Sequence, residues 1–118
     1  MQNYITETQK AYAAGIMDGE GSIVFSPRQR DSTGKPKYTV VVISITNKDY
    51  PLLEHVQNII GGKIYRHEAP YWRLVIHKQS DVIYCLENIM EYLSLKKESA
   101  QLALADLKSR QQLKGVIP

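Results

Sequence analysis

The stretch Ala13-Ala-Gly-Ile-Met-Asp-Gly-Glu-Gly21 decides how this chain is organised. It lies in a helix that we expect to begin at Thr6, because Thr6 and Gln9 have the spacing of a capping box. Within the helix, a glycine at position 15 costs about 1 kcal/mol relative to alanine. Small residues nevertheless recur at every fourth position, namely Ala11, Gly15 and Gly19. A stripe of this kind lets a second backbone approach closely.

Two carboxylates stand at the end of the same helix. Asp18 and Glu20 lie where the helix dipole disfavours negative charge, and no Lys or Arg is adjacent to them in the sequence. Oxygen ligands of this type suit a hard divalent cation such as Mg²⁺. An alternative is that Asp18 caps the local turn, Glu20 is solvated, and the glycines end the helix in a left-handed conformation.

The rest of the chain alternates between strand and helix patterns. A long β-branched run over 37–47 is the clearest strand, and apolar residues at helical spacing follow Asp49. Strands are expected at 22–26, 37–47, 62–68 and 71–77, and further helices at 49–60, 80–93 and 95–112. The order αββαββα plus a C-terminal helix predicts an α+β fold, in which helices cover one face of a four-stranded antiparallel sheet.

The uncovered face of this sheet is expected to be basic. Residues 28–78 hold nine of the basic side chains and four of the acidic ones, so they carry the whole excess of a chain whose net charge is +3. Strand alternation turns Val41 and Ile43 toward the helices and Val42 and Ser44 away from them. A β-surface that mixes Arg with Ser, Thr and small apolar groups can enter the major groove of DNA. A solvated antiparallel face is the plainer alternative.

Length and composition exclude several classes of protein. With 118 residues we expect a single domain over 1–118, and a lone Cys85 leaves no internal disulfide. No apolar run is long enough to cross a membrane, and the N-terminus lacks a secretory pattern, so an intracellular location is expected, in a prokaryotic cytoplasm or nucleoid or in an organelle. No phosphate-binding glycine loop or catalytic serine motif occurs.

The segment AAGIMDGEG followed by Ser-Ile-Val-Phe resembles the signature of the LAGLIDADG homing endonucleases. Ala14, Gly15, Asp18 and Gly21 are identical to the letters of that name, and Glu20 replaces its second Asp. The element order and the Gly-Gly before the third strand extend the resemblance over roughly residues 4–107. The fold it implies uses the four-stranded sheet as a saddle for DNA.

The resemblance also implies roles for individual residues. Glu20 takes the place of the catalytic, metal-binding acid, with the Gly19 carbonyl as a further ligand of Mg²⁺ or Mn²⁺. Asn47 and Lys96 match polar residues around the active-site water, and Lys97 is an equally good candidate for the second position. The expected DNA-binding residues are Val24, Ser26, Arg28, Arg30, Lys37, Tyr38, Val40, Val42, Ser44, Arg66, Arg73 and His77.

Because the motif occurs once, the resemblance implies a homodimer on a near-palindromic double-stranded target. The dimer surface is expected to include Ala11, Ala14, Gly15 and Asp18. The activity implied is Mg²⁺-dependent hydrolysis of both DNA strands, with no membrane or small-molecule partner. Two alternatives remain: a non-cleaving DNA- or RNA-binding protein on the same fold, such as a maturase or regulator, and an interaction domain in which the glycine stripe mediates only dimerisation.

Overall fold

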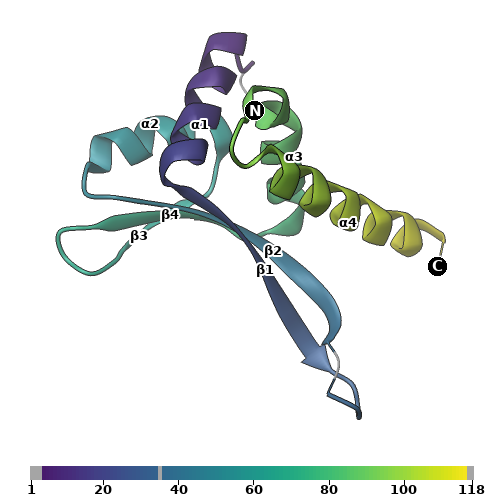
Figure 1. Cartoon of the computed structure of the whole chain (residues 1–118). Coiled ribbons are helices and arrows are strands. Elements are labelled where there is room, and N and C mark those ends of the chain that lie inside the picture. Colours follow the sequence, from purple (N-terminus) through teal and green to yellow (C-terminus); the bar gives the residue numbers. More distant parts are fainter. Residues whose placement is uncertain (1–3, 35, 117–118) are drawn as a thin grey trace.

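The computed structural model describes residues 4–34 and 36–116, with side chains at 4–28, 31–34 and 39–110. The elements are α1 (Glu7–Glu20), β1 (Gly21–Arg30), β2 (Pro36–Asn47), α2 (Tyr50–Ile60), β3 (Lys63–Arg66), β4 (Trp72–Ile76), α3 (Gln79–Ile89), the 3₁₀ turn η1 (Met90–Tyr92) and α4 (Lys97–Val116) (Figure 1). The predicted α+β order of elements is confirmed. None of the helices in the described ranges is both long and apolar enough to cross a membrane.

The four strands form one antiparallel sheet in the order β1-β2-β4-β3. The odd-numbered residues Val41, Ile43 and Ile45 are buried, as their alternation predicted, and the helices lie on their side of the sheet (Figure 1). The β1–β2 hairpin extends well past the two other strands (Figure 1). β1 therefore runs on to Arg30, beyond the strand expected at 22–26, because it stays paired with β2 as far as Pro36.

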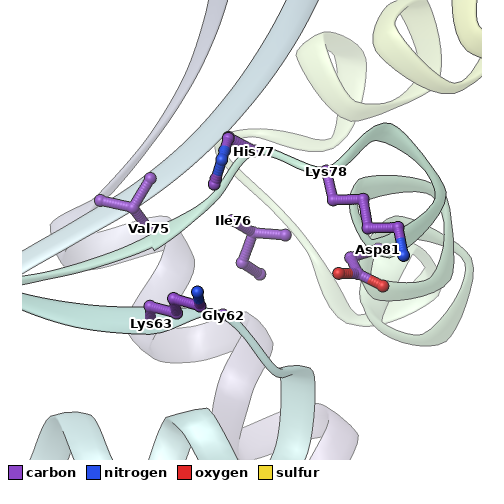
Figure 2. Close-up of a pocket in the computed structure, with 7 residues that line it drawn as sticks. All are labelled: Gly62, Lys63, Val75, Ile76, His77, Lys78 and Asp81. Carbon is purple, nitrogen blue, oxygen red and sulfur yellow. The ribbon is translucent and has the colours of Figure 1, made fainter.

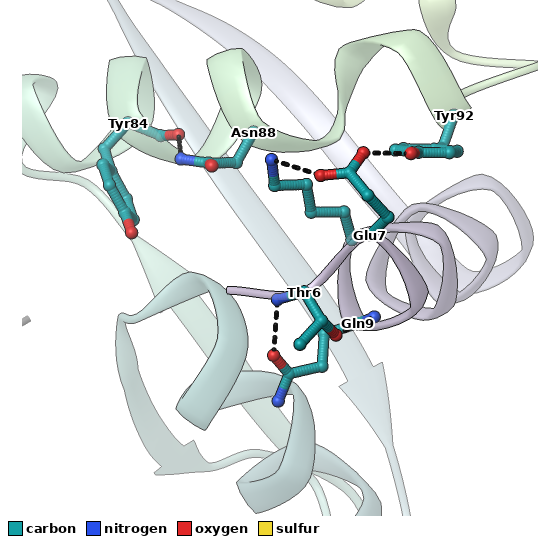
Figure 3. Close-up of polar contacts among 7 residues, drawn as sticks. Thr6, Glu7, Gln9, Tyr84, Asn88 and Tyr92 are labelled. Carbon is teal, nitrogen blue, oxygen red and sulfur yellow. Dashed lines mark hydrogen bonds and ion pairs between the residues drawn. The ribbon is translucent and has the colours of Figure 1, made fainter. Parts of the chain in front are cut away.

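Helix α1 begins with the predicted capping box. The Gln9 backbone N–H donates to Thr6 Oγ1 at 3.1 Å, and the Thr6 N–H donates to Gln9 Oε1 at 2.9 Å (Figure 3). Next to it, the Glu7 carboxylate accepts hydrogen bonds from the Tyr92 hydroxyl and from the Lys10 ammonium (Figure 3). The Tyr92 bond, then the Lys10 bond, lowers the pKa of Glu7, and the same carboxylate raises the pKa of Tyr92 to about 12. The hydrogen bond between Tyr92 and Glu7 holds the start of α1 against η1.

The junction of α1 with β1 depends on a close backbone approach. A Cβ atom on Gly21 would lie 2.5 Å from Met17 Sδ and 2.9 Å from the Met17 carbonyl oxygen, so only glycine fits there. Gly21 itself is extended, with φ −91° and ψ 169°. The left-handed glycine cap considered from the sequence is therefore wrong, and the helix passes directly into the strand. Glu20 is thereby held at the edge of the sheet.

The C-terminal third departs from expectation in its boundaries. The helix expected over 80–93 ends at Ile89 and continues as η1, and α4 begins at Lys97 and extends to Val116. The later start of α4 follows from hydrogen bonds that Asp18 makes to the preceding segment, described below.

Candidate active site and nucleic-acid interface

The two carboxylates at the end of α1 have different partners. Asp18 Oδ2 accepts the Ser94 backbone N–H at 2.7 Å, and Asp18 Oδ1 accepts the Lys96 backbone N–H at 2.9 Å. The half-buried Asp18 thus binds the segment that leads into α4, 76 residues or more away in the sequence. The alternative in which Asp18 caps its own turn is wrong.

Lys96 lies against the same end of α1. Its Nζ donates to the Asp18 carbonyl oxygen at 2.8 Å, which puts a cation at the negative pole of a helix whose last turn contains no basic residue. Lys97 Nζ instead donates to the Glu91 carbonyl oxygen at 3.4 Å. Of the two candidate lysines, Lys96 is therefore the one that contacts α1, the helix that contains the motif.

Glu20 is exposed and is held by Asn47. Asn47 Nδ2 donates to Glu20 Oε2 at 2.5 Å, and Asn47 Oδ1 accepts the Asp49 backbone N–H at 2.7 Å. The second bond fixes which end of the Asn47 amide faces the carboxylate. The fold thus brings together two of the predicted catalytic residues, which are 27 positions apart.

The charges of Asp18 and Glu20 are compensated unequally. Asp18 receives two backbone N–H groups, and the Lys96 ammonium binds its carbonyl oxygen. Glu20 has no Lys, Arg or His within ion-pair distance among the described side chains, whose ion pairs all lie elsewhere. Among the described residues, neither carboxylate forms an ion pair, but Asp18 also receives two backbone N–H groups, so Glu20 is the less compensated of the two.

The strand register defines an outer face, on the side of the sheet opposite the helices. Val24 pairs with Val42, Thr46 with Arg73, and Arg73 with Tyr65, so their side chains share one side. With their neighbours at alternate positions, the described side chains of the outer face are Ser22, Val24, Ser26, Arg28, Val40, Val42, Ser44, Thr46, Lys63, Tyr65, Arg73 and Val75. Lys63 and Tyr65 were missed from the sequence because β3 has only four residues and its register was not evident.

Three expected DNA-binding side chains, those of Arg30, Lys37 and Tyr38, lie outside the described side chains. Their backbones belong to the far part of the β1–β2 hairpin, where Arg28 pairs with Tyr38. Arg28 itself is exposed.

Arg73 is held in place on the outer face. Its Nε donates to Thr46 Oγ1 at 3.2 Å, and its Nη2 lies 3.1 Å from His67 Nε2. The half-buried guanidinium therefore has a fixed orientation in the middle of the face. His67 was not among the expected site residues, because its contact depends on the β3–β4 register.

Arg66 does not share this face, although it was expected among the DNA-binding residues. It pairs with Trp72, whose neighbour Leu74 is buried under the helices, so Arg66 lies on the helix side. Its guanidinium carbon is 5.0 Å from the centre of the Trp72 ring, and Tyr50 packs edge-on against the same ring at 4.8 Å. A cation–π contact, rather than the outer face, accounts for this residue.

His77 lies just beyond the end of β4, at a pocket between the β3–β4 edge and the start of α3 (Figure 2). The charged lining residues are Lys63, Lys78 and Asp81, and backbone and apolar atoms supply the remainder. The expected contact residue His77 is exposed there and continues the alternation of Arg73 and Val75. It therefore extends the outer face toward this edge of the sheet.

The small-residue stripe of α1 lies on the surface of the chain, whereas Ala14 beside it lies in the core. Ala11, Gly15 and Gly19 are exposed, and a Cβ atom on either glycine would meet no heavy atom within 4 Å. Ala14 is completely buried in the core of the chain. Its expected place in a dimer surface is wrong, because helical periodicity turns it toward the hydrophobic core of its own chain.

Comparison with known proteins bears on this arrangement. A family model described as LAGLIDADG endonuclease matches residues 13–110. Among solved structures, the homing endonuclease I-CvuI in complex with its target in the presence of 2 mM Ca has a TM-score of 0.76 at 23% identity, covering 91% of this chain and 70% of that one. The archaeal intron-encoded homing endonuclease I-Vdi141I complexed with DNA has a TM-score of 0.73 at 22% identity, covering 90% and 70%.

A third structure, I-SmaMI bound to uncleaved DNA target in the presence of calcium ions, has a TM-score of 0.71 at 22% identity. That match covers 92% of this chain but 39% of the other. At these identities the structures establish the fold, and the family model, which covers most of the chain, establishes the family. The chain belongs to the LAGLIDADG endonuclease family.

Proposed function

We propose that this chain is one half of a homodimeric homing endonuclease, which makes a double-strand break in a near-palindromic DNA target by divalent-metal-dependent hydrolysis. The observation that carries the proposal is the state of Glu20. Its carboxylate is exposed at the end of the motif helix, oriented by Asn47, and without a cationic partner among the described residues. A carboxylate in this state is suited to binding a cation.

The glycines of α1 support a dimer formed along this helix. The chain's own packing gives no reason for glycine at positions 15 and 19, since a Cβ atom there would have open space. Glycine in a helix interior still costs about 1 kcal/mol each. A second copy of α1 that approaches the stripe by two-fold symmetry supplies the reason, because side chains would hold the two backbones apart. The match to I-SmaMI, in which this chain covers 39% of the other, is compatible with a partner of equal size.

The residues present fit half of a divalent-cation site. Glu20 supplies carboxylate oxygen, the exposed Gly19 supplies a carbonyl at the helix end, and both are ligand types that Mg²⁺ and Mn²⁺ accept. Within the described residues no three His, Cys, Asp or Glu side chains gather to hold a metal ion. We propose that the second copy, DNA phosphate oxygens and water would supply the remaining ligands.

Each residue of the site has a separate task in hydrolysis. When bound, a divalent ion lowers the pKa of an attacking water and stabilises negative charge on the phosphate. Glu20 would hold the ion, and Asn47 holds the Glu20 carboxylate in one orientation. Lys96 adds positive charge beside the motif, where it can favour approach of a phosphate.

DNA is proposed to lie against the outer face. Arg28, Arg73 and Lys63 supply positive charge, and their neighbours Val42, Ser44 and Thr46 supply methyl and hydroxyl groups. Arginine reads guanine and methyl groups contact thymine in the major groove. The fixed guanidinium of Arg73 suits such readout, because little conformational entropy is lost when it binds.

The experiment that tests the proposal is cleavage of a plasmid library that includes the DNA flanking the protein's own gene. The wild-type chain is incubated with the library in Mg²⁺ and in Ca²⁺, and the broken ends are mapped. The expected result is a double-strand break at one sequence in Mg²⁺, no break with Glu20→Gln, and binding by both proteins. Binding without cleavage by the wild-type chain would favour the non-cleaving DNA- or RNA-binding alternative, and a monomer on DNA would contradict the dimer.

A further inference from the structure

The side chain of Gln79, the first residue of α3, takes the place of a missing strand residue in the sheet. β4 ends at Ile76, which pairs with Ile43 of β2. Val41 lies on β2 two residues before Ile43, and its backbone N–H donates to Gln79 Oε1 at 2.9 Å. Gln79 Nε2 in turn donates to the Val41 carbonyl oxygen at 2.8 Å. These two bonds reproduce the pattern of one antiparallel rung.

The environment of Val41 makes this rung necessary. The Val41 residue is fully buried, so its backbone N–H and C=O have no access to water as substitute partners. Gln79 Nε2 donates also to the His77 carbonyl oxygen at 2.7 Å, which fixes the amide's orientation from the β4 side. The side chain therefore joins β2, the end of β4 and the start of α3 at a single point.

Beyond Val41 the sheet narrows to two strands. Ser26 pairs with Val40, Pro27 with Thr39 and Arg28 with Tyr38, and no third strand accompanies them in the described part of the chain. We call this distal hairpin, residues 26–34 and 36–40, the hairpin arm; it projects away from the helices (Figure 1). A two-stranded ribbon is only marginally stable on its own, so the direction in which it projects depends on the contacts at its base. The Gln79 rung lies at that base.

We propose that Gln79 is a positioning residue, which sets the direction of the hairpin arm and thereby the base pairs that Arg28 reaches. The proposal rests on the proposed function, since it assumes that the outer face meets DNA. Gln79 lies on a helix, and the hydrogen bonds of its side chain are to backbone atoms of Val41 and His77, so it acts through the arm and not by contact with DNA.

The test compares Gln79→Met with a matched control, Gln57→Met. Methionine keeps the length of the side chain and removes its amide. Gln57 is also partly buried, and its Nε2 donates to the Gly62 carbonyl oxygen at 3.0 Å, at the far edge of the sheet from the arm. The first measurement is amide hydrogen exchange in the free protein. We expect Val41 N–H exchange to accelerate at least about tenfold in Gln79→Met and to stay unchanged in Gln57→Met, with Ile43 protected in both.

The second measurement is base preference at every position of the selected target. Arg28→Ala identifies the positions that the arm reads, and Arg73→Ala identifies those read at the middle of the sheet. Gln79→Met is expected to lose roughly tenfold in discrimination at the Arg28 positions, and to keep the wild-type preference at the Arg73 positions. A uniform loss of affinity, or a loss shared equally by Gln57→Met, would overturn the proposal.

The two measurements separate the proposal from its premise. If neither arginine variant changes base preference, the outer face does not read DNA, and the proposed function fails whatever Gln79 does. If the arginine variants behave as expected while Gln79→Met leaves the Arg28 positions unchanged, the inference about Gln79 alone is wrong. Unchanged exchange at Val41 in Gln79→Met would contradict the rung itself.

Discussion

Two physical arguments predict opposite effects of Asp18→Ala on the stability of the folded chain. By position alone, removing an anion from the C-terminal end of a helix should stabilise the chain by about 0.3–1 kcal/mol. In the structure, Asp18→Ala instead breaks two charge-assisted hydrogen bonds to the Ser94 and Lys96 backbones. Such bonds are worth about 1.5–3 kcal/mol each, and the lower value applies because Ser94 is exposed. After the dipole relief is subtracted, the net loss is about 2 kcal/mol.

Urea unfolding at one fixed protein concentration measures this effect through the free energy of unfolding. Asp18→Asn keeps one acceptor oxygen and should lose about half as much as Asp18→Ala. The control Asp106→Ala removes an exposed pair with Arg110 and should cost at most about 0.5 kcal/mol. A variant Asp18→Ala that is as stable as the wild-type chain, or more stable, would refute the reasoning that Asp18 anchors the start of α4.

Tyr92→Phe should destabilise the chain at neutral pH and less so in acid. Because the hydrogen bond from Tyr92 lowers the pKa of Glu7, this bond stabilises the chain above pH 4.5, the ordinary pKa of Glu7. The stabilisation is lost as the pH falls through the pKa of Glu7 in the folded state. The same variant's effect should also shrink as pH rises through about 12, where the folded-state Tyr92 ionises, and melting curves that differ equally at all pH values would contradict this. Cys85 should react slowly with a thiol reagent at pH 8 and rapidly after unfolding in urea, since complete burial raises its pKa to about 12; immediate labelling of the folded chain would show that the site is open. The double variant Arg28→Ala with Arg73→Ala should lower the slope of log K against log salt by about 1 for each DNA phosphate that the protein no longer neutralises, and an unchanged slope would show that neither arginine neutralises a phosphate.

The features that depend on residues close together in the sequence could be predicted from the sequence. The capping box at Thr6 and Gln9 formed because both partners lie within one turn. The buried side of β2 followed from strict alternation over a long β-branched run, with Val41 and Ile45 inside. The nearness of Glu20 and Asn47 was expected through the resemblance to a family, and the hydrogen bond between them was found in the structure.

What sequence reasoning missed depends on contacts between distant segments. The role of Asp18 is set by backbone groups of Ser94 and Lys96, which no spacing within the motif reveals. Arg66 was expected to bind DNA but lies on the helix side, because a strand of four residues has too few alternating positions for the sequence to show which side it faces. Ala14 was expected in the dimer surface from the motif, whereas the rotation of α1 about its axis buries it in the core of its own chain.

The central claim is that Glu20 is a cation ligand, since no cationic side chain in the described part of the chain pairs with its carboxylate. Calorimetric titration of Ca²⁺ into the protein–DNA complex measures it directly, without cleavage. The account predicts that Glu20→Gln weakens Ca²⁺ binding at least about tenfold with DNA binding retained. Glu87→Gln, the control, removes a carboxylate paired with Lys108 and should leave Ca²⁺ affinity unchanged. Equal Ca²⁺ affinity of the wild-type and Glu20→Gln complexes would contradict the account.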